Sequence, residues 1–355
     1  MKSLMVRIGL LWLLLVTALP GYAREAEGLY QAEIPVKGQD RDERLAAYAG
    51  AMAQVVVKLT GDRNAPQSSR LAKVMSSAQN WVQQYSYQPL EVPSLKEQGY
   101  TRLLLVQFDE RAVSQALVAA AVPLWGRTRP DLLVWLAVEE GASRVLLAAK
   151  GGSEFEGVVD ANARRRGLPL VLPLLDGEDQ KRLGFSDVWG NFRQPIMAAS
   201  KRYGANAVLV GRINRLTDGS WQGRWSLYEG EDVQHWVGTG VEQNGVVASG
   251  IDGVADRFAR RYAQLLTAGT SNQLAVTVTN VSTLAGYARA QQYLLSLDLV
   301  TKVQMTKVEG EKVLFTLDVR GDASGIDRAI ILGGTLRRTT AMGEATAMPV
   351  YQLLP

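Results

Sequence analysis

Carboxylates are the only common catalytic side chains that this chain holds in quantity, because it has no cysteine and a single histidine, His235. Histidine titrates near neutral pH and is the side chain that most often transfers protons in enzymes. His235 stands between Gln234 and Trp236 in an expected strand, and no second histidine exists to complete a metal-binding spacing such as His-x-x-x-His. We therefore expect an ordinary strand histidine and no bound metal.

Nucleophile and nucleotide motifs are missing from the sequence as well. Without cysteine there is no thiolate, no disulfide and no Cys-ligated metal. No Gly-x-Ser-x-Gly elbow or Ser-x-x-Lys pair activates a serine. Gly238-Thr-Gly240 lacks the third glycine and the following helix of a dinucleotide-binding loop. We expect no cofactor and no catalytic serine or cysteine.

The acidic residues leave one enzymatic alternative open. Glu139 and Glu140 end an expected central strand, where open α/β sheets place their ligand crevices. Four more acids cluster in one loop region: Asp176, Glu178, Asp179 and Asp187. Two carboxylates are enough to hydrolyse a glycosidic bond. Acids at strand ends and in loops are usually solvated, however, so we favour that interpretation and keep Glu139 and Glu140 as the pair that a hydrolase would use.

Trp221 and Trp225 lie four residues apart on an expected strand and therefore on one face of a sheet. Asp218-Gly219 is a strong two-residue turn signal, which pairs Leu216 with Trp221 and Arg212 with Trp225. If this face is open, the row forms an aromatic platform for a sugar or a peptide, with a guanidinium over one indole. If a helix covers it, both tryptophans are core residues, and we favour the covered alternative.

Three consecutive arginines, Arg164, Arg165 and Arg166, suggest a site for an anionic ligand such as a lipid phosphate. They also fall at the expected carboxyl end of a helix, where cations interact favourably with the helix dipole. We favour the second interpretation.

Hydrophobic spacing predicts the elements that would position these residues. Between 29 and 125 we expect a helix over 45–59, capped by Asp40 with Glu43 and ended by Gly61. A short helix over 68–79, strands over 81–90 and 100–108, and a helix after Asp109 follow. Two prolines and a glycine within 122–130 indicate a domain junction.

From 131 to 269 strands and helices alternate. The continuous apolar run 132–138 is typical of a strand buried on both sheet faces. The other expected elements are helices at 155–166, around 196–203 and at 251–265, and strands at 168–172, 207–216, 220–228 and 233–239. From 271 to 340 the order is βαββαβ, a ferredoxin-like arrangement. The predicted fold class is α/β (α+β), with three small mixed-sheet domains in tandem, and residues 341–355 form a tail without an assignment.

The first 23 residues have the layout of a cleavable export signal. Lys2 and Arg7 precede an apolar run over 8–19, which is shorter than the roughly 20 residues that span a membrane. Gly21 and Ala23 place small side chains before a cut between Ala23 and Arg24. We expect a periplasmic protein, divided as 1–23 signal, 24–128, 129–269, 270–340 and 341–355, with no stable membrane insertion after cleavage. The net charge of +4 falls when Lys2 and Arg7 are removed, so we expect no nucleic-acid partner.

Several stretches resemble a family named domain of unknown function 2066, found in exported proteins of Gram-negative bacteria. They are Val57-Lys-Leu-Thr-Gly-Asp-Arg63, Phe108-Asp109, Pro123-Leu-Trp-Gly-Arg-Thr-Arg-Pro130, Leu132-Leu-Val-Trp-Leu136 and Arg166-Gly-Leu-Pro-Leu-Val-Leu-Pro173. The resemblance implies a periplasmic address and no chemistry. Gly204-Ala-Asn-Ala-Val-Leu-Val-Gly211 is similar to TolB amino-terminal-like envelope domains, which implies docking of partners. We expect a non-catalytic module that binds an envelope protein or peptidoglycan; the alternative is a carboxylate-dependent peptidoglycan hydrolase.

Overall fold

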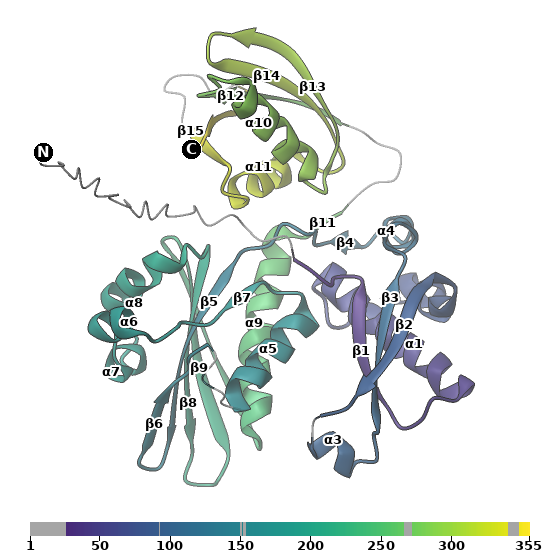
Figure 1. Cartoon of the computed structure of the whole chain (residues 1–355), viewed down its shortest axis with the longest axis vertical. Coiled ribbons are helices and arrows are strands. Elements are labelled where there is room, and N and C mark those ends of the chain that lie inside the picture. The colour runs from purple at the N-terminus through teal and green to yellow at the C-terminus, as the bar shows by residue number, and fades with distance from the viewer. Residues whose placement is uncertain (1–25, 92, 150, 152–153, 266–271, 340–347) are drawn as a thin grey trace, which may run out of the picture.

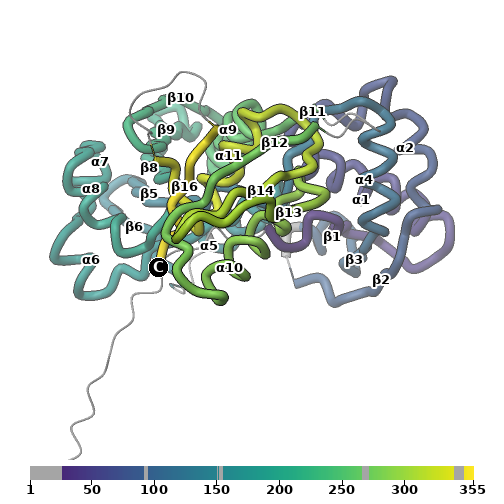
Figure 2. The backbone as a smooth tube through the Cα atoms, turned by 90° about the horizontal axis from the view of Figure 1, so that it is seen from above, coloured from purple at the N-terminus to yellow at the C-terminus, as the bar shows by residue number. Residues whose placement is uncertain are grey.

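A computed structural model describes residues 26–91, 93–149, 151, 154–265, 272–339 and 348–355. The expected cleavage site at Ala23 and Arg24 lies outside these residues. Helices pack on a sheet in each unit, and the sheets of the second and third units are mixed, so the predicted α/β class is confirmed. Figure 1 shows three sheet-based units, with the carboxy-terminal one above the other two, and Figure 2 shows it from above, lying across the junction between them.

The amino-terminal unit is a three-stranded antiparallel sheet with helices on one face. Its sheet order is β1-β3-β2, with strands β1 (Gln31–Val36), β2 (Val82–Pro89) and β3 (Arg102–Phe108). The helices are α1 (Arg41–Thr60), α2 (Ala72–Ser76), α3 (Pro93–Glu97) and α4 (Glu110–Ala119), with 3-10 turns η1 (Ala65–Gln67), η2 (Ser69–Leu71) and η3 (Ala78–Trp81). Helix α1 begins and ends as predicted, because Asp40 accepts from the Glu43 N–H and Gly61 adopts a left-handed φ of 71°.

The middle unit is a larger mixed sheet with helices on both faces. Its order is β10-β9-β8-β5-β6, and a short strand, β7, also pairs with β5. The strands are β5 (Leu132–Glu140), β6 (Ser143–Leu146), β7 (Leu170–Val171), β8 (Ala207–Arg215), β9 (Trp221–Glu229) and β10 (Asp232–Gly240). The helices are α5 (Glu154–Arg166), α6 (Gly177–Arg182), α7 (Phe185–Trp189), α8 (Arg193–Ser200), η4 (Lys201–Tyr203) and α9 (Gln243–Tyr262).

Strand β5 is buried on both faces, as its apolar run predicts. Alternate residues of β5 pack against α5 and α9 on one face and against α6, α7 and α8 on the other. The two glutamates that end β5 are the first of its residues to reach solvent.

The hairpin between β8 and β9 differs from the prediction by one residue. The Leu216 N–H donates to the Ser220 carbonyl at 2.7 Å, so the loop has three residues instead of two. It closes with Gly219 at a φ of 85°, the glycine-bulge form of three-residue hairpins. Arg212 consequently faces Arg224, and Trp225 faces Gly211.

The carboxy-terminal unit contains the predicted βαββαβ order and one strand more. Its elements are β12 (Asn272–Thr279), α10 (Leu284–Ser296), β13 (Val300–Glu309), β14 (Lys312–Val319), α11 (Ala323–Leu332), β15 (Leu336–Thr339) and β16 (Val350–Leu353). The sheet order is β13-β14-β12-β16-β15. Strand β16 comes from the tail that had no assignment; it pairs parallel to β12 and separates it from β15.

The three units meet along short extended segments. β4 (Pro123–Leu124), which leaves the first unit, pairs with β11 (Gln264–Leu265), which leaves the second. The Arg127 N–H donates to Asp298 of the third unit, and the Gln264 side chain lies against Gly325 of α11. Among the described residues no helix combines the length and the apolar character needed to span a membrane.

Candidate functional site

The two glutamates kept for the hydrolase alternative lie apart in separate ion pairs. Glu139 accepts from Arg144 Nε at 2.8 Å, and Glu140 accepts from Arg215 Nη1 at 3.2 Å. Neither lines any of the pockets described below. Each carboxylate is therefore bound by an arginine of its own, and the two do not form the facing pair that a glycosidase uses.

The acidic loop region serves the local structure. Asp176 caps α6 and accepts from Arg202 at 2.7 Å, and this hydrogen bond holds the pKa of Asp176 well below its usual range. Asp179 is buried and accepts from Tyr203, whose pKa burial raises to about 12 with a further contribution from that hydrogen bond. Asp187 accepts from the backbone at the start of α7. No group of three or more potential metal ligands occurs within the described ranges.

Trp221 and Trp225 do not form an exposed platform. Trp221 is 8% and Trp225 1% exposed, because both lie under α9 in the core of the middle unit. The shifted hairpin register turns Arg212 to the opposite face, where its Nη1 lies 3.5 Å from the Trp189 carbonyl. Burial lowers the pKa of Arg212. The two tryptophans are thus core residues, which is the alternative that the sequence favoured, and they do not join Arg212 in an open surface.

His235 lies in β10 as expected, and its ring contacts a serine. His235 Nδ1 and Ser226 Oγ are 2.9 Å apart, and Asn191 Nδ2 donates to the same hydroxyl at 3.1 Å. Ser226 is fully buried, so a substrate has no access to its oxygen. This contact therefore orders the hairpin beside α7 and offers no activated nucleophile.

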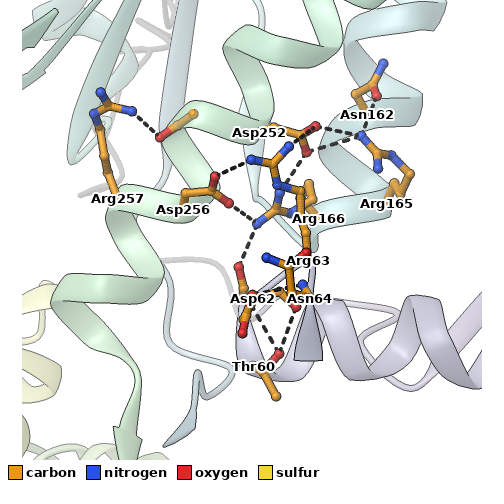
Figure 3. A network of polar contacts seen from close by, with 12 residues as sticks. Thr60, Asp62, Arg63, Asn64, Asn162, Arg165, Arg166, Asp252, Asp256 and Arg257 are labelled. Carbon is orange, nitrogen blue, oxygen red and sulfur yellow. Dashed lines mark hydrogen bonds and ion pairs between the residues drawn. The ribbon is translucent and has the colours of Figure 1, made fainter. Parts of the chain in front are cut away.

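The arginine run at the end of α5 is part of a network that joins the first two units. Arg166 is fully buried, and it donates to Asp252 Oδ1 and to Asp256 Oδ1 of α9, each at 2.7 Å. Its Nη2 also donates to the Gly61 carbonyl at the end of α1, at 2.7 Å. Figure 3 shows this guanidinium reaching from α5 between the two aspartates toward the loop after α1.

The exposed members of the network surround Arg166. Arg165 reaches Asp252 at 3.2 Å, and Arg63, from the loop after α1, reaches Asp256 at 2.9 Å. Arg164 instead pairs with Asp160 on its own helix. Because the anions that face this cluster are aspartates of the same chain, the arginine run is occupied in joining helices and is not a free anion site.

A second buried arginine, Arg129, belongs to the junction motif and was not identified as important by sequence reasoning. Its guanidinium donates to the carbonyls of Lys58, Trp125 and Gly167 at 2.7, 2.9 and 2.8 Å. It also lies 4.0 Å from the centre of the Trp125 ring, in cation–π contact. The residues of the Trp-Gly-Arg-Thr-Arg-Pro motif therefore fasten the first unit to the second.

Lys58 is a buried cation on α1 at the same junction. Its Nζ donates to the carbonyls of Gly28 and Gln31 at 3.0 and 2.8 Å, and burial lowers its pKa to about 8. A lysine with a lowered folded-state pKa destabilises the fold while it is charged in both states. That penalty is complete below about pH 8 and is relieved as the pH rises toward the unfolded value of roughly 10.4.

Between pH 8 and 10 we therefore expect wild-type stability to rise relative to Lys58→Met, by up to about 1.4 kcal/mol per pH unit. Urea unfolding of both proteins across this range measures the difference. Lys73→Met, which removes an exposed lysine of α2, is the matched control for the substitution itself. A flat difference for Lys58→Met would contradict the assignment.

Two hollows combine apolar and polar linings. The larger, about 910 Å³, lies between the uncovered face of the β1-β3-β2 sheet and α5, and we name it the sheet groove. The smaller, about 520 Å³, lies where Tyr30 and α4 meet Asp298 and Leu299 of the third unit. In the smaller one Tyr30 and Ser114 are hydrogen-bonded at 2.7 Å and Glu110 pairs with Arg127, so much of its polar lining is already satisfied.

Comparison with known proteins adds a partial family assignment. Residues 23–126 match a family described as "Domain of unknown function (DUF8605)", which covers the first unit and less than half of the chain. A family of unknown function is thus confirmed for this segment, although it is not the family 2066 that the sequence resembles. No curated protein matches.

One similar solved structure is described as "Crystal structure of uncharacterized protein". It is 14% identical, the match covers 37% of this chain and 91% of that chain, and the TM-score is 0.17. A likeness at this level carries no inference about fold or function, and these comparisons give no support to the TolB-like resemblance of the middle unit.

Proposed function

We propose that this chain is an exported, non-catalytic binding module that holds a protein partner in the sheet groove. The observation that carries the proposal is the uncovered face of the β1-β3-β2 sheet, which floors a groove of about 910 Å³ instead of packing on a helix. Ligand sites are typically concave and of roughly this size, with apolar linings and a few polar groups. Export is inferred from the first 23 residues, and it places the partner in the periplasm.

The floor of the groove suits a polypeptide. The strand register places Leu103 and Leu105 in the centre strand, and both are half-buried. The flanking residues on this face are mostly uncharged and polar: Gln31, Gln84, Ser86, Gln88 and Gln107. Amide side chains beside leucines can hydrogen-bond the backbone of a partner while its apolar side chains cover the leucines.

The wall of the groove adds charge of both signs. Arg164 and Arg165 of α5 line one side, and Glu27, Glu33 and Glu91 lie on the sheet side. Mixed charge at the rim of an apolar floor orients a protein partner more than it increases affinity. Catalysis is not favoured by any observation, because Glu139 and Glu140 are ion-paired outside both hollows.

Leu105→Glu tests the proposal, because it places a carboxylate in the floor beside Glu33. Full-length protein is crosslinked in periplasmic extract, and captured proteins are identified by mass spectrometry. We expect wild type to enrich a defined partner and Leu105→Glu to bind it at least roughly tenfold more weakly.

Val308→Glu is the matched control, since Val308 is 54% exposed on β13 of the third unit, and it should retain the partner. Circular dichroism confirms that both variants fold. Enrichment of peptidoglycan fragments alone, or capture that Leu105→Glu leaves unchanged, would overturn the proposal.

A further inference from the structure

Strand β2 is an edge of the first sheet whose outer side has no described partner. The sheet order leaves β1 and β2 as the two edges. The β1 edge is covered by α1, because Lys58 donates to the Gln31 carbonyl at 2.8 Å and Gln54 donates to the Glu33 carbonyl at 3.3 Å. Figure 2 shows β2 at the periphery of the molecule.

The register identifies which groups of β2 face outward. In antiparallel pairs, successive residues alternate in directing their N–H and C=O toward the neighbour. The Gln31 and Glu33 carbonyls accept from α1 and therefore point away from β3. Their cross-strand partners on β3, Gln107 and Leu105, consequently direct their backbone groups toward β2. Those residues face Gln84 and Ser86, so Tyr85 and Tyr87 direct their N–H and C=O outward. The described residues provide no hydrogen-bond partner for these outward groups.

The β2 edge carries no charge along its length. Natural edge strands commonly carry charges that prevent pairing with another chain. The segment 82–90 reads Val-Gln-Gln-Tyr-Ser-Tyr-Gln-Pro-Leu and holds no charged residue. Pro89 at its end lacks a donor, and a bulge falls between Val82 and Gln84, so the regular stretch available for pairing is 84–88.

This stretch is the same in both directions. Gln84-Tyr85-Ser86-Tyr87-Gln88 is a palindrome centred on Ser86. A two-fold symmetric interface must be self-complementary, because both chains contribute the same surface patch to it. Antiparallel pairing about Ser86 sets Tyr85 opposite Tyr87 of the second copy and Gln84 opposite Gln88. Because the outward groups belong to Tyr85 and Tyr87, these two positions form roughly four backbone hydrogen bonds across the pair.

The two tyrosine side chains of this stretch are already packed against their neighbours in the single chain. The rings of Tyr85 and Tyr87 lie edge to face with centroids 6.1 Å apart, and Tyr48 meets Tyr85 at 6.0 Å. The Arg44 guanidinium lies 5.4 Å from the Tyr85 ring, which is nevertheless 46% exposed. Rings already held by neighbours lose little conformational entropy on binding.

We propose that the β2 edge pairs with the β2 edge of a second copy of this chain, joining two three-stranded sheets into one continuous sheet. A foreign strand would also satisfy the backbone groups, but it gives no reason for a charge-free palindrome centred where a two-fold axis would pass. An interface limited to one strand edge buries little surface, so the dimer is weak and its population depends on protein concentration. The pairing uses the outward backbone groups of β2, whereas the proposed function uses the floor of the sheet groove; the side chains of Gln84, Ser86 and Gln88 line that groove as well. The pairing does not depend on the proposed function.

A cysteine scan in this cysteine-free chain tests the register. Ser86 faces its own copy in a non-hydrogen-bonded pair, where the Cα atoms are about 4.5 Å apart, a separation within the disulfide range. Under mild oxidation, purified Ser86→Cys should form a covalent dimer, detected on a non-reducing gel, at least roughly tenfold faster than Thr239→Cys, an exposed position on the edge strand β10.

Two further variants distinguish this register from random collision. Gln84→Cys and Gln88→Cys face each other across the pair and not themselves, so each alone should crosslink slowly while an equimolar mixture crosslinks rapidly. Ser86→Lys should weaken the dimer at least roughly tenfold in sedimentation equilibrium, because two like charges meet at the axis. Circular dichroism checks the fold of every variant. Ser86→Cys that crosslinks no faster than Thr239→Cys, or a mixture no faster than its components, would overturn the proposal.

Discussion

Arg166→Met is expected to lower the free energy of unfolding by about 3–5 kcal/mol, the range for removing one partner of a buried ion pair. The guanidinium is fully buried and donates to Asp252, Asp256 and the Gly61 carbonyl, all at 2.7 Å. Methionine fills similar volume but leaves three acceptors short of a donor, two of them negatively charged. Urea unfolding followed by circular dichroism measures the loss.

Arg164→Met is the matched control from the same run of three arginines. Arg164 is exposed, and its ion-pair partner among the described residues is Asp160 one turn away, an interaction of about 0.3–0.5 kcal/mol. Because Arg166 joins α1, α5 and α9, its loss should also separate the unfolding of the first unit from that of the second. A single transition shifted by less than about 1 kcal/mol would show that Arg63 and Arg165 replace it.

Trp225→Ala is expected to cost about 3–5 kcal/mol, as for other large-to-small changes in a core. The ring is 1% exposed and occupies space that neighbouring glycines leave free. A Cβ at Gly211 or Gly250 would lie 2.4 Å from it. The glycines at these places have no side chain that could extend into the cavity that truncation creates, so we expect the full penalty in urea unfolding.

Arg224→Ala is the control on the adjacent, exposed position of β9, where we expect a change within about 0.5 kcal/mol. Trp225→Ala also tests the hairpin register, in combination with Arg212→Ala. With Trp225 opposite Gly211, a double-mutant cycle between Arg212→Ala and Trp225→Ala should give a coupling energy near zero. A coupling above about 1 kcal/mol would support the two-residue turn instead.

Local patterns predicted most elements, because helix periodicity, caps and strand alternation are encoded within a few residues. Helix α1, for example, follows from its apolar stripe together with Asp40 and Gly61. The predicted loop length of the β8–β9 hairpin was wrong for an equally local reason. Asp218-Gly219 suits a two-residue turn, but Gly219 with positive φ also closes a three-residue loop, and the sequence does not distinguish the two.

The remaining differences are non-local. Nothing near Arg166 in the chain indicates that Asp252 and Asp256 will face it. From the sequence, the favourable interaction of a cation with the carboxyl end of a helix already explained an arginine at this position. The role of Arg129 could not be predicted either, because its acceptors are backbone carbonyls, which every residue has. Strand β16 has four residues, too short for a clear alternation. The palindrome around Ser86, in contrast, is present in the sequence, but only the sheet order shows that it lies on an edge strand.

The interior position of β16 has a consequence for how the protein is made. As the chain emerges from its amino-terminal side, the strands of the first sheet are complete by residue 108 and those of the second by residue 240, so each sheet can assemble before the third is complete. The third sheet differs, because a strand between β12 and β15 is supplied only by 350–353. Until those residues have emerged, the edge of β12 is open to mispairing, and chaperones that shield exposed strands would be needed for longest at this unit.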